Sequence, residues 1–188
     1  VNAVEQRRAT RRARAQERIS AVVRDVNQSL VRAGTRAEIE QAVCSRLSRS
    51  DPYVFAWIGD REAGTERIVP TAWAGVEAGY LDEITVTTDD TETGQGPAGM
   101  ALRTGQVFVS QNVRENPEFE PWREDAIERG YRAVAGVPLR YGEDCYGVLG
   151  VYADREEAFA DAERAVRVQL GEIVGDAIAS AERQRALM

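Results

Sequence analysis

Two stretches with helical spacing of apolar residues, one near each end of the 188-residue chain, constrain its fold most strongly. In both stretches the apolar residues recur at steps of three and four. The first stripe comprises Ile19, Val22, Val23, Val26 and Leu30, and the second comprises Val166, Leu170, Ile173, Val174, Ala177, Ile178 and Ala181. Because a helix must bury such a face, we expect a bundle, formed either within one chain or between two. Asp161 is a suitable N-cap for the second helix.

Between these helices the sequence predicts a mixture of strands and short helices. A capping-box pattern from Thr35 to Glu38 opens a further helix. The apolar run at residues 53–58 predicts a strand deep in a sheet that is covered on both sides. Further strands are expected at 67–74, 107–110, 133–139 and 145–152, with helices at 98–103 and 118–130. The last two strands carry small residues that would let a helix backbone approach closely: Ala133, Ala135, Gly136, Gly147 and Gly150.

The first 18 residues differ in charge from the rest of the chain. They hold six arginines and two glutamates, a net charge of +4 that leaves −11 for the remainder. We interpret residues 1–18 as a linker helix from an upstream domain and residues 19–188 as the domain itself. A nucleic-acid-binding arm is the alternative, but an acidic body would oppose phosphate binding. Because the chain begins at Val1 without an initiating Met, we expect it to be part of a longer polypeptide.

Two residue types are absent, and their absence excludes several kinds of active site. There is no histidine, so Ser-His-Asp and Cys-His catalysis and His-ligated zinc or haem are excluded. There is no lysine either, which excludes a Schiff-base or P-loop lysine. The two cysteines, Cys44 and Cys145, form no CxxC pair. We therefore expect no enzyme activity, no metal and no cofactor.

Composition also suggests where the protein works. A lysine-free chain with a net charge of −7 is typical either of salt-loving archaea or of GC-rich codon usage. No apolar run approaches the roughly 18 residues of a transmembrane helix, and the N-terminus lacks the order of a signal peptide. We expect a cytoplasmic protein without membrane contact.

The segment from Gly94 to Gly99 satisfies the G-x-G-x-x-G pattern of dinucleotide sites. That pattern needs a preceding buried parallel strand and an acidic residue about 20 positions later, and neither is present here. Pro97 instead fits the first position of a helix, with glycines shaping the approach to it. The segment is interpreted as structural.

Four segments in this order resemble the GAF family. They are Gly96–Gly105, which ends in Thr-Gly; the strand Val107–Ser110; Ala133–Leu139, which ends in Val-Pro-Leu; and Tyr146–Tyr152, which contains Gly-Val-Leu. Phe159 and the helix from Asp161 match the close of the domain. The resemblance implies an α/β (α+β), GAF/PAS-like fold. Its central, mostly antiparallel sheet of five to six strands carries long terminal helices on one face and a helical and loop insert over the other.

A narrower resemblance links the chain to the GAF region of haloarchaeal bacterio-opsin activator-like regulators. It is carried by Ala21–Asn27, Phe55–Gly59, Ala72–Gly75, Gly79–Leu81 and Phe119–Trp122. In that family a GAF module precedes a helix-turn-helix domain. This chain has no recognisable helix-turn-helix, so DNA contact is expected only through a domain outside it.

The resemblance further implies a small-molecule pocket beneath the insert. Its walls would come from Phe55, Trp57, Trp73, Tyr80, Phe108, Phe119, Trp122 and Tyr131. Arg103 and Arg132 are candidate anchors for an anionic ligand, but surface roles are favoured for both. Bilin, haem and cyclic nucleotides are disfavoured because the residues that hold them in the family are missing, which leaves a small metabolite or no ligand.

We therefore expect a regulatory sensor domain in signal transduction or transcription, which binds a small ligand, forms a homodimer, or does both. The expected dimer is parallel and packs the stripes that start at Ile19 and Val166. Two alternatives stay open: a ligand-free dimerisation scaffold, and a GAF-type free methionine sulfoxide reductase. The loops that would carry catalytic cysteines in such a reductase contain none.

Overall fold

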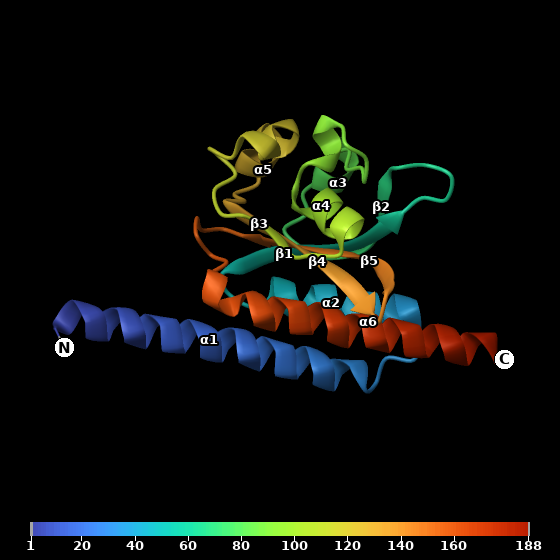
Figure 1. The fold of residues 1–188 in the computed structure, drawn as a ribbon, viewed down its shortest axis with the longest axis horizontal. Helices are drawn as coiled ribbons and strands as arrows, with labels where there is room; N and C mark the ends of the chain where they lie inside the picture. The colour runs from blue at the N-terminus through green and yellow to red at the C-terminus, as the bar shows by residue number, and fades with distance from the viewer. Residues whose placement is uncertain (1, 188) are drawn as a thin grey trace.

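The computed structural model describes residues 2–187, apart from the side chains of Ala15 and Gln16. It has three layers, with a sheet between two sets of helices (Figure 1). The long helices α1 (Ala3–Leu30), α2 (Arg36–Ser48) and α6 (Arg164–Ala186) cover one face. The other face carries the insert, with α3 (Tyr80–Glu83), α4 (Pro97–Thr104) and α5 (Arg123–Glu128) and the 3-10 turns Glu92–Gly94 and Pro117–Trp122. A third 3-10 turn, Asp161–Glu163, precedes α6.

The sheet has five antiparallel strands in the order β2-β1-β5-β4-β3. The strands are β1 (Tyr53–Arg61), β2 (Ile68–Gly75), β3 (Phe108–Ser110), β4 (Ala133–Tyr141) and β5 (Asp144–Ala153). Side chains on both faces of β1 are buried, as the apolar run at 53–58 predicted. The expected α/β architecture is confirmed, with an antiparallel sheet of five strands, long helices on one face and an insert over the other.

The two terminal stripes pack against each other and α2 within one chain. Val26, Val174 and Ile178 are fully buried in the core on the helix side of the sheet. The intrachain bundle is therefore the arrangement that the structure takes. Helix α1 is continuous across residue 18, and its arginine-rich first half projects beyond the sheet (Figure 1). Among the side chains of α1 that the structure describes, those of residues 3–14 are exposed and Ile19 is the first buried one.

Two helix boundaries differ from the sequence predictions. Asp161 does not cap α6, because residues Asp161–Glu163 first form a 3-10 turn whose N-cap is Ala160. The predicted helix at 118–130 is instead a 3-10 segment followed by the short α5. Pro121 explains the second difference, since proline lacks an N–H donor and disfavours α conformation in the residue before it. Gly130, at φ +84°, ends the segment as expected. No helix within residues 2–187 is both long and apolar enough to cross a membrane.

Strand β4 lies in direct contact with helix backbone on both of its faces. A Cβ added at Gly136 would overlap the carbonyl oxygen of Pro97 at the start of α4. On the other face, a Cβ at Gly171 or Gly175 of α6 would overlap the carbonyl oxygens of Pro138 and Arg140. Gly136 thus confirms the expected close approach of a helix backbone.

Gly147 and Gly150 serve a different purpose from the expected one. Gly147 leaves room for the carbonyl of Gly59 on the adjacent strand, and Gly150 leaves room for the indole of Trp57. These two glycines therefore accommodate a neighbouring strand and a side chain, not a helix.

We predict that Gly175→Ala destabilises the protein, although alanine favours helix by about 1 kcal/mol. The new methyl group would force α6 away from β4, which should lower the free energy of unfolding by roughly 1–3 kcal/mol. Urea denaturation measures the change. Gly34→Ala is the matched control, since a Cβ there meets nothing within 4 Å. Equal stability of the two variants would contradict the close approach.

Candidate functional site

The insert and the sheet enclose a cluster of aromatic side chains. We call the space at its centre the chamber, and its lining consists of Tyr80, Val86, Gly96, Pro97, Ala98, Phe119, Trp122, Val134, Gly150 and Tyr152. The open volume is only about 10 Å³, which is close to the smallest cavity that holds one water molecule. In this structure the rings themselves fill the chamber.

The rings pack face to face and edge to face. Phe55 stacks on Tyr131 with centroids 5.4 Å apart, and Tyr131 meets Tyr152 edge-on at 4.8 Å. Tyr80 approaches Tyr131 and Tyr152 at 5.0 and 5.4 Å. These offset and perpendicular arrangements are the favourable ones for aromatic pairs. Strands β1 and β5 therefore supply a rigid aromatic floor, and the insert supplies the rings above it.

The polar atoms of the cluster already have partners. The indole N–H of Trp57 donates to the hydroxyl of Tyr152 at 3.1 Å, and that of Trp122 donates to the carbonyl of Thr85 at 2.8 Å. The Tyr131 hydroxyl donates to the carbonyl of Val76. Burial raises the pKa of Tyr80 and of Tyr152. The phenols therefore stay neutral, and the chamber carries no charge.

Most of the predicted pocket residues lie together. Tyr80, Phe119 and Trp122 line the chamber directly. Phe55, Trp57 and Tyr131 are buried in the same aromatic cluster behind that lining.

Two predicted pocket residues are corrected. Trp73 pairs with Trp57 and shares its face of the sheet, but β2 is an edge strand, and Trp73 is 49% exposed. Phe108 lies on the other edge strand, β3, where it pairs with Gly136 of β4. Its side chain is only half-buried and does not line the chamber. Both residues have the right type, but the sheet order places them outside the site.

Several lining residues escaped prediction, above all Tyr152. Val148, Gly150 and Tyr152 alternate along β5, so they share one face of the strand, and Gly150 makes room there for Trp57. That alternation was the available signal. Val134 faces the chamber by the same kind of alternation, because it lies on β4 between Ala133 and Ala135, which face the other side of the sheet. Val86 carries no comparable signal, because it lies outside the regular elements of the insert.

The two arginines considered as anchors for an anionic ligand bond to backbone carbonyls outside the chamber. Arg103 donates to the carbonyls of Thr88 and Asp89 in the loop before α4. Arg132 donates to the carbonyl of Tyr131 at 2.9 Å. Neither arginine lines the chamber, and both bond to backbone carbonyls, in keeping with the surface roles that the sequence favoured.

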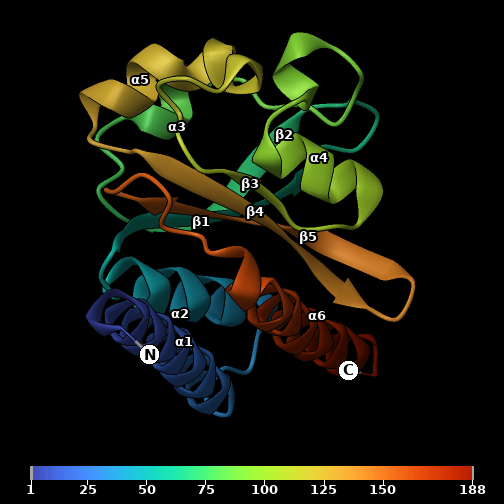
Figure 2. The ribbon, with the colours of Figure 1, turned by 60° about the vertical axis from the view of Figure 1, so that its left-hand side comes forward.

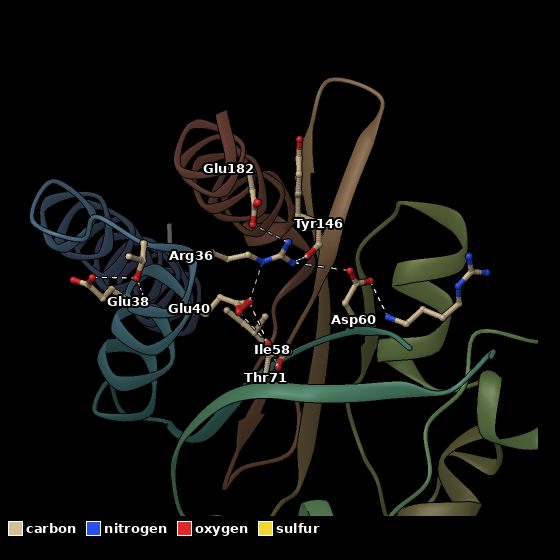
Figure 3. Close-up of polar contacts among 10 residues, drawn as sticks. Arg36, Glu38, Glu40, Ile58, Asp60, Thr71, Tyr146 and Glu182 are labelled. Carbon is tan, nitrogen blue, oxygen red and sulfur yellow. Dashed lines mark hydrogen bonds and ion pairs between the residues drawn. The ribbon is translucent and has the colours of Figure 1, made fainter. Parts of the chain in front are cut away.

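The opposite face of the sheet holds a polar junction centred on Arg36 (Figure 3). Its guanidinium donates to the carbonyl of Tyr146 at 2.5 Å and lies 3.7 Å from the Glu40 carboxylate and 3.6 Å from that of Glu182. The Thr71 hydroxyl donates to Glu40 at 3.0 Å. Two side chains of α2, Arg36 and Glu40, thus connect α2 with β5, β2 and the C-terminal part of α6.

Glu40 is the buried member of this junction, with 4% of its surface exposed. Burial raises its pKa, while the hydrogen bond from Thr71 and the charge of Arg36 act in the opposite direction. The folded state therefore holds the Glu40 proton more tightly than the unfolded state does. The Glu40 contribution to stability is full below about pH 4.5 and is lost as pH rises through the raised pKa.

We predict that Glu40→Gln removes this pH dependence. The stability of the wild-type protein relative to the variant should fall as pH rises from about 4 toward neutrality, because only the wild type loses a buried proton. Denaturation midpoints across that range measure the difference. Thr71→Val should steepen the fall, since it removes the donor that lowers the pKa of Glu40. A constant difference between wild type and Glu40→Gln would contradict the account.

Neither cysteine lies at the chamber. Cys44 is buried in α2 among the core residues on the helix side, and Cys145 is exposed at the β4–β5 turn. Burial raises the pKa of both thiols, so neither is an activated thiolate. Among the described residues, no group of three or more acidic or cysteine side chains is placed to hold a metal ion.

The chain is similar to transcription regulators of haloarchaea. It is 30% identical over 171 residues to a Haloferax volcanii protein described as a transcriptional regulator, covering 90% of this chain and 28% of that protein. It is 27% identical over 181 residues to the bacterioopsin transcriptional activator of Halobacterium salinarum, covering 91% of this chain and 24% of that protein. The chain thus spans about a quarter of the length of these relatives.

Solved structures share the fold at low sequence identity. The GAF domain of a phosphoenolpyruvate-protein phosphotransferase from Coxiella burnetii superposes with a TM-score of 0.70 at 18% identity, covering 91% of this chain and 98% of that one. The free methionine-R-sulfoxide reductase of Neisseria meningitidis superposes with the same TM-score at 16% identity, covering 89% and 91%. Likeness at this level establishes the fold alone.

The sequence model of the GAF domain matches residues 33–179. That range holds the whole sheet, the insert, α2 and most of α6. It leaves α1 outside the match. This chain belongs to the GAF domain family.

Proposed function

We propose that this chain is the regulatory sensor domain of a longer transcription regulator and that its chamber binds a small molecule. The aromatic chamber between the sheet and the insert is the observation that carries the proposal. Concave aromatic sites with few polar groups suit small ligands. The relatives of this chain support a regulatory role. Contact with DNA would belong to a segment outside this chain, and residues 1–18 would link the domain to an upstream one.

Ligand binding requires the chamber to open, because its present volume is about 10 Å³. We call the part of the insert that covers the chamber the roof. Side chains that donate hydrogen bonds to loop carbonyls hold it in place. Trp122 bonds to Thr85, Tyr131 bonds to Val76, and Arg129 donates to Ala78 at 3.1 Å. Such bonds contribute about 1 kcal/mol each. A ligand that binds only the open form would shift the population toward that form.

A ligand-free scaffold is the second candidate, and the tight ring packing in the chamber favours it. Native mass spectrometry of the purified chain, followed by a thermal-shift screen of metabolites, separates the two functions. The sensor predicts a retained mass, or compounds that raise the melting temperature in a saturable manner. Trp122→Ala should change the size of these shifts, whereas Trp73→Ala should not. No retained mass and no saturable shift from a broad screen would favour the scaffold.

Reductase activity is the least supported function. The positions of Cys44 and Cys145 away from the chamber argue against a thiol mechanism there. We propose that the chain is not an enzyme. An assay with free methionine sulfoxide decides the matter, and activity that Cys145→Ser abolishes would overturn this proposal.

We also propose a cytoplasmic homodimer that forms through the terminal helices. The stripe that starts at Ile19 is already buried within the chain. A dimer would therefore use a partly exposed flank of α6, which consists of Val166, Ile173, Ala177 and Ala181. These residues recur at helical spacing and would pack two α6 helices side by side.

We predict that Ile173→Glu converts the dimer to a monomer without unfolding it, because the new carboxylate would be buried only in the dimer. Light scattering at high salt gives the mass, and circular dichroism monitors the fold. Val168→Glu, on an exposed face of α6, is the matched control and should stay dimeric. A monomeric wild-type chain would contradict the proposed dimer.

A further inference from the structure

We propose that the chamber takes an uncharged, flat and mostly apolar ligand of one or two fused rings, and that this ligand displaces the side chain of Trp122. The inference rests on the proposed ligand-binding function and defines the chemical class of the ligand. Three observations carry it: the charge of the lining, the hydrogen bonds already formed, and the place of Trp122 in the roof.

The lining offers no partner for a charged ligand. All ten residues that form it are uncharged. Two charged side chains of the insert bond to its own backbone: Arg129 to the carbonyls of Ala78 and Asp125, and Glu77 to the N–H groups of Gly79 and Leu81. The guanidinium of Arg129 lies over the ring of Tyr80, 5.7 Å from its centroid, but its charge is already paired with the Asp125 carboxylate at 3.5 Å. Moving an ion from water into such a site costs several kcal/mol without a counter-charge. Phosphates, carboxylates and ammonium groups are therefore disfavoured.

The lining also offers little to a strongly polar neutral ligand. The N–H groups of Trp57 and Trp122 and the hydroxyl of Tyr131 are already engaged. Among the described residues, the only buried side-chain N or O atoms without a partner are Nε and Nη1 of Arg167. Arg167 lies on α6, across the sheet from the chamber. A sugar-like ligand would thus lose hydrogen bonds to water and regain few.

Trp122 can move without disturbing the sheet. It ends an irregular 3-10 segment, whereas Phe55, Trp57 and Tyr152 are fixed on paired strands. Its indole lies over Gly96, where a Cβ would come within 2.6 Å of the ring atom Cη2. One hydrogen bond, to Thr85, holds its N–H. Rotation of this indole out of the chamber would free a space of its own size, which suits a ligand of one or two rings.

The test compares three probes that share one ring system: indole, the anion indole-3-carboxylate and the cation tryptamine. Binding to the wild-type chain and to Trp122→Ala is measured by titration calorimetry. We expect indole to bind Trp122→Ala at least about 100-fold more tightly than either charged probe, since an unpaired buried charge is strongly disfavoured. Indole should bind the wild type more weakly than the variant, because the indole of Trp122 must first leave. Trp73→Ala should bind indole as the wild type does.

Trp122→Leu serves in place of Trp122→Ala if the larger truncation fails to fold, since leucine keeps part of the apolar volume. Charged probes that bind as tightly as indole would overturn the assigned ligand class. A screen in which charged or sugar-like compounds bind and indole does not would also overturn the assigned ligand class. In that case the proposed sensor function would stand. If no compound binds, not even indole to the enlarged chamber of Trp122→Ala, both the ligand class and the proposed sensor function are overturned. Preferential binding of indole, enhanced by removal of Trp122, supports the proposal.

Discussion

The close approach of two helices to opposite faces of β4 is the constraint on which the rest of the structure depends. Gly136 admits the backbone of α4 on the insert side, and Gly171 and Gly175 admit the backbone of α6 on the other. The start of α4 lines the chamber, and α6 is one of the long terminal helices. The chamber and α6 are therefore separated by a single strand, with backbone in contact on each side. Close-packed elements transmit small displacements well.

Much of this architecture can be predicted from the sequence, because periodic apolar positions indicate helices and small residues indicate close packing. The stripes that start at Ile19 and Val166 predicted the terminal helices, and Gly136 predicted close packing on β4. Side chains whose role depends on strand order are harder to predict. Trp73 and Phe108 resemble pocket residues in type, but each lies on an edge strand. Tyr152 alternates with Val148 and Gly150 along β5, but the sequence does not show that β5 lies at the centre of the sheet.

The distribution of charge separates the two faces of the sheet. Around the chamber the phenols and indoles are neutral and hydrogen-bonded to one another or to backbone. On the helix face, by contrast, a buried carboxylate and an arginine join α2, the sheet and α6. The chamber side is thus suited to apolar contacts that form or break at moderate cost. The Arg36 junction holds the C-terminal part of α6 against the sheet through directional, charged contacts.

The proposed sensor function requires occupation of the chamber to reach α6, and β4 is the strand that lies between them. Hydrogen exchange of the wild-type chain, followed by mass spectrometry with and without saturating indole, tests this claim most directly. The account predicts changed protection in peptides that cover β4 and residues 164–179 of α6, together with those of the insert, and no change in residues 3–14 of α1. A change confined to the insert would contradict it, because the chamber would then be isolated from α6.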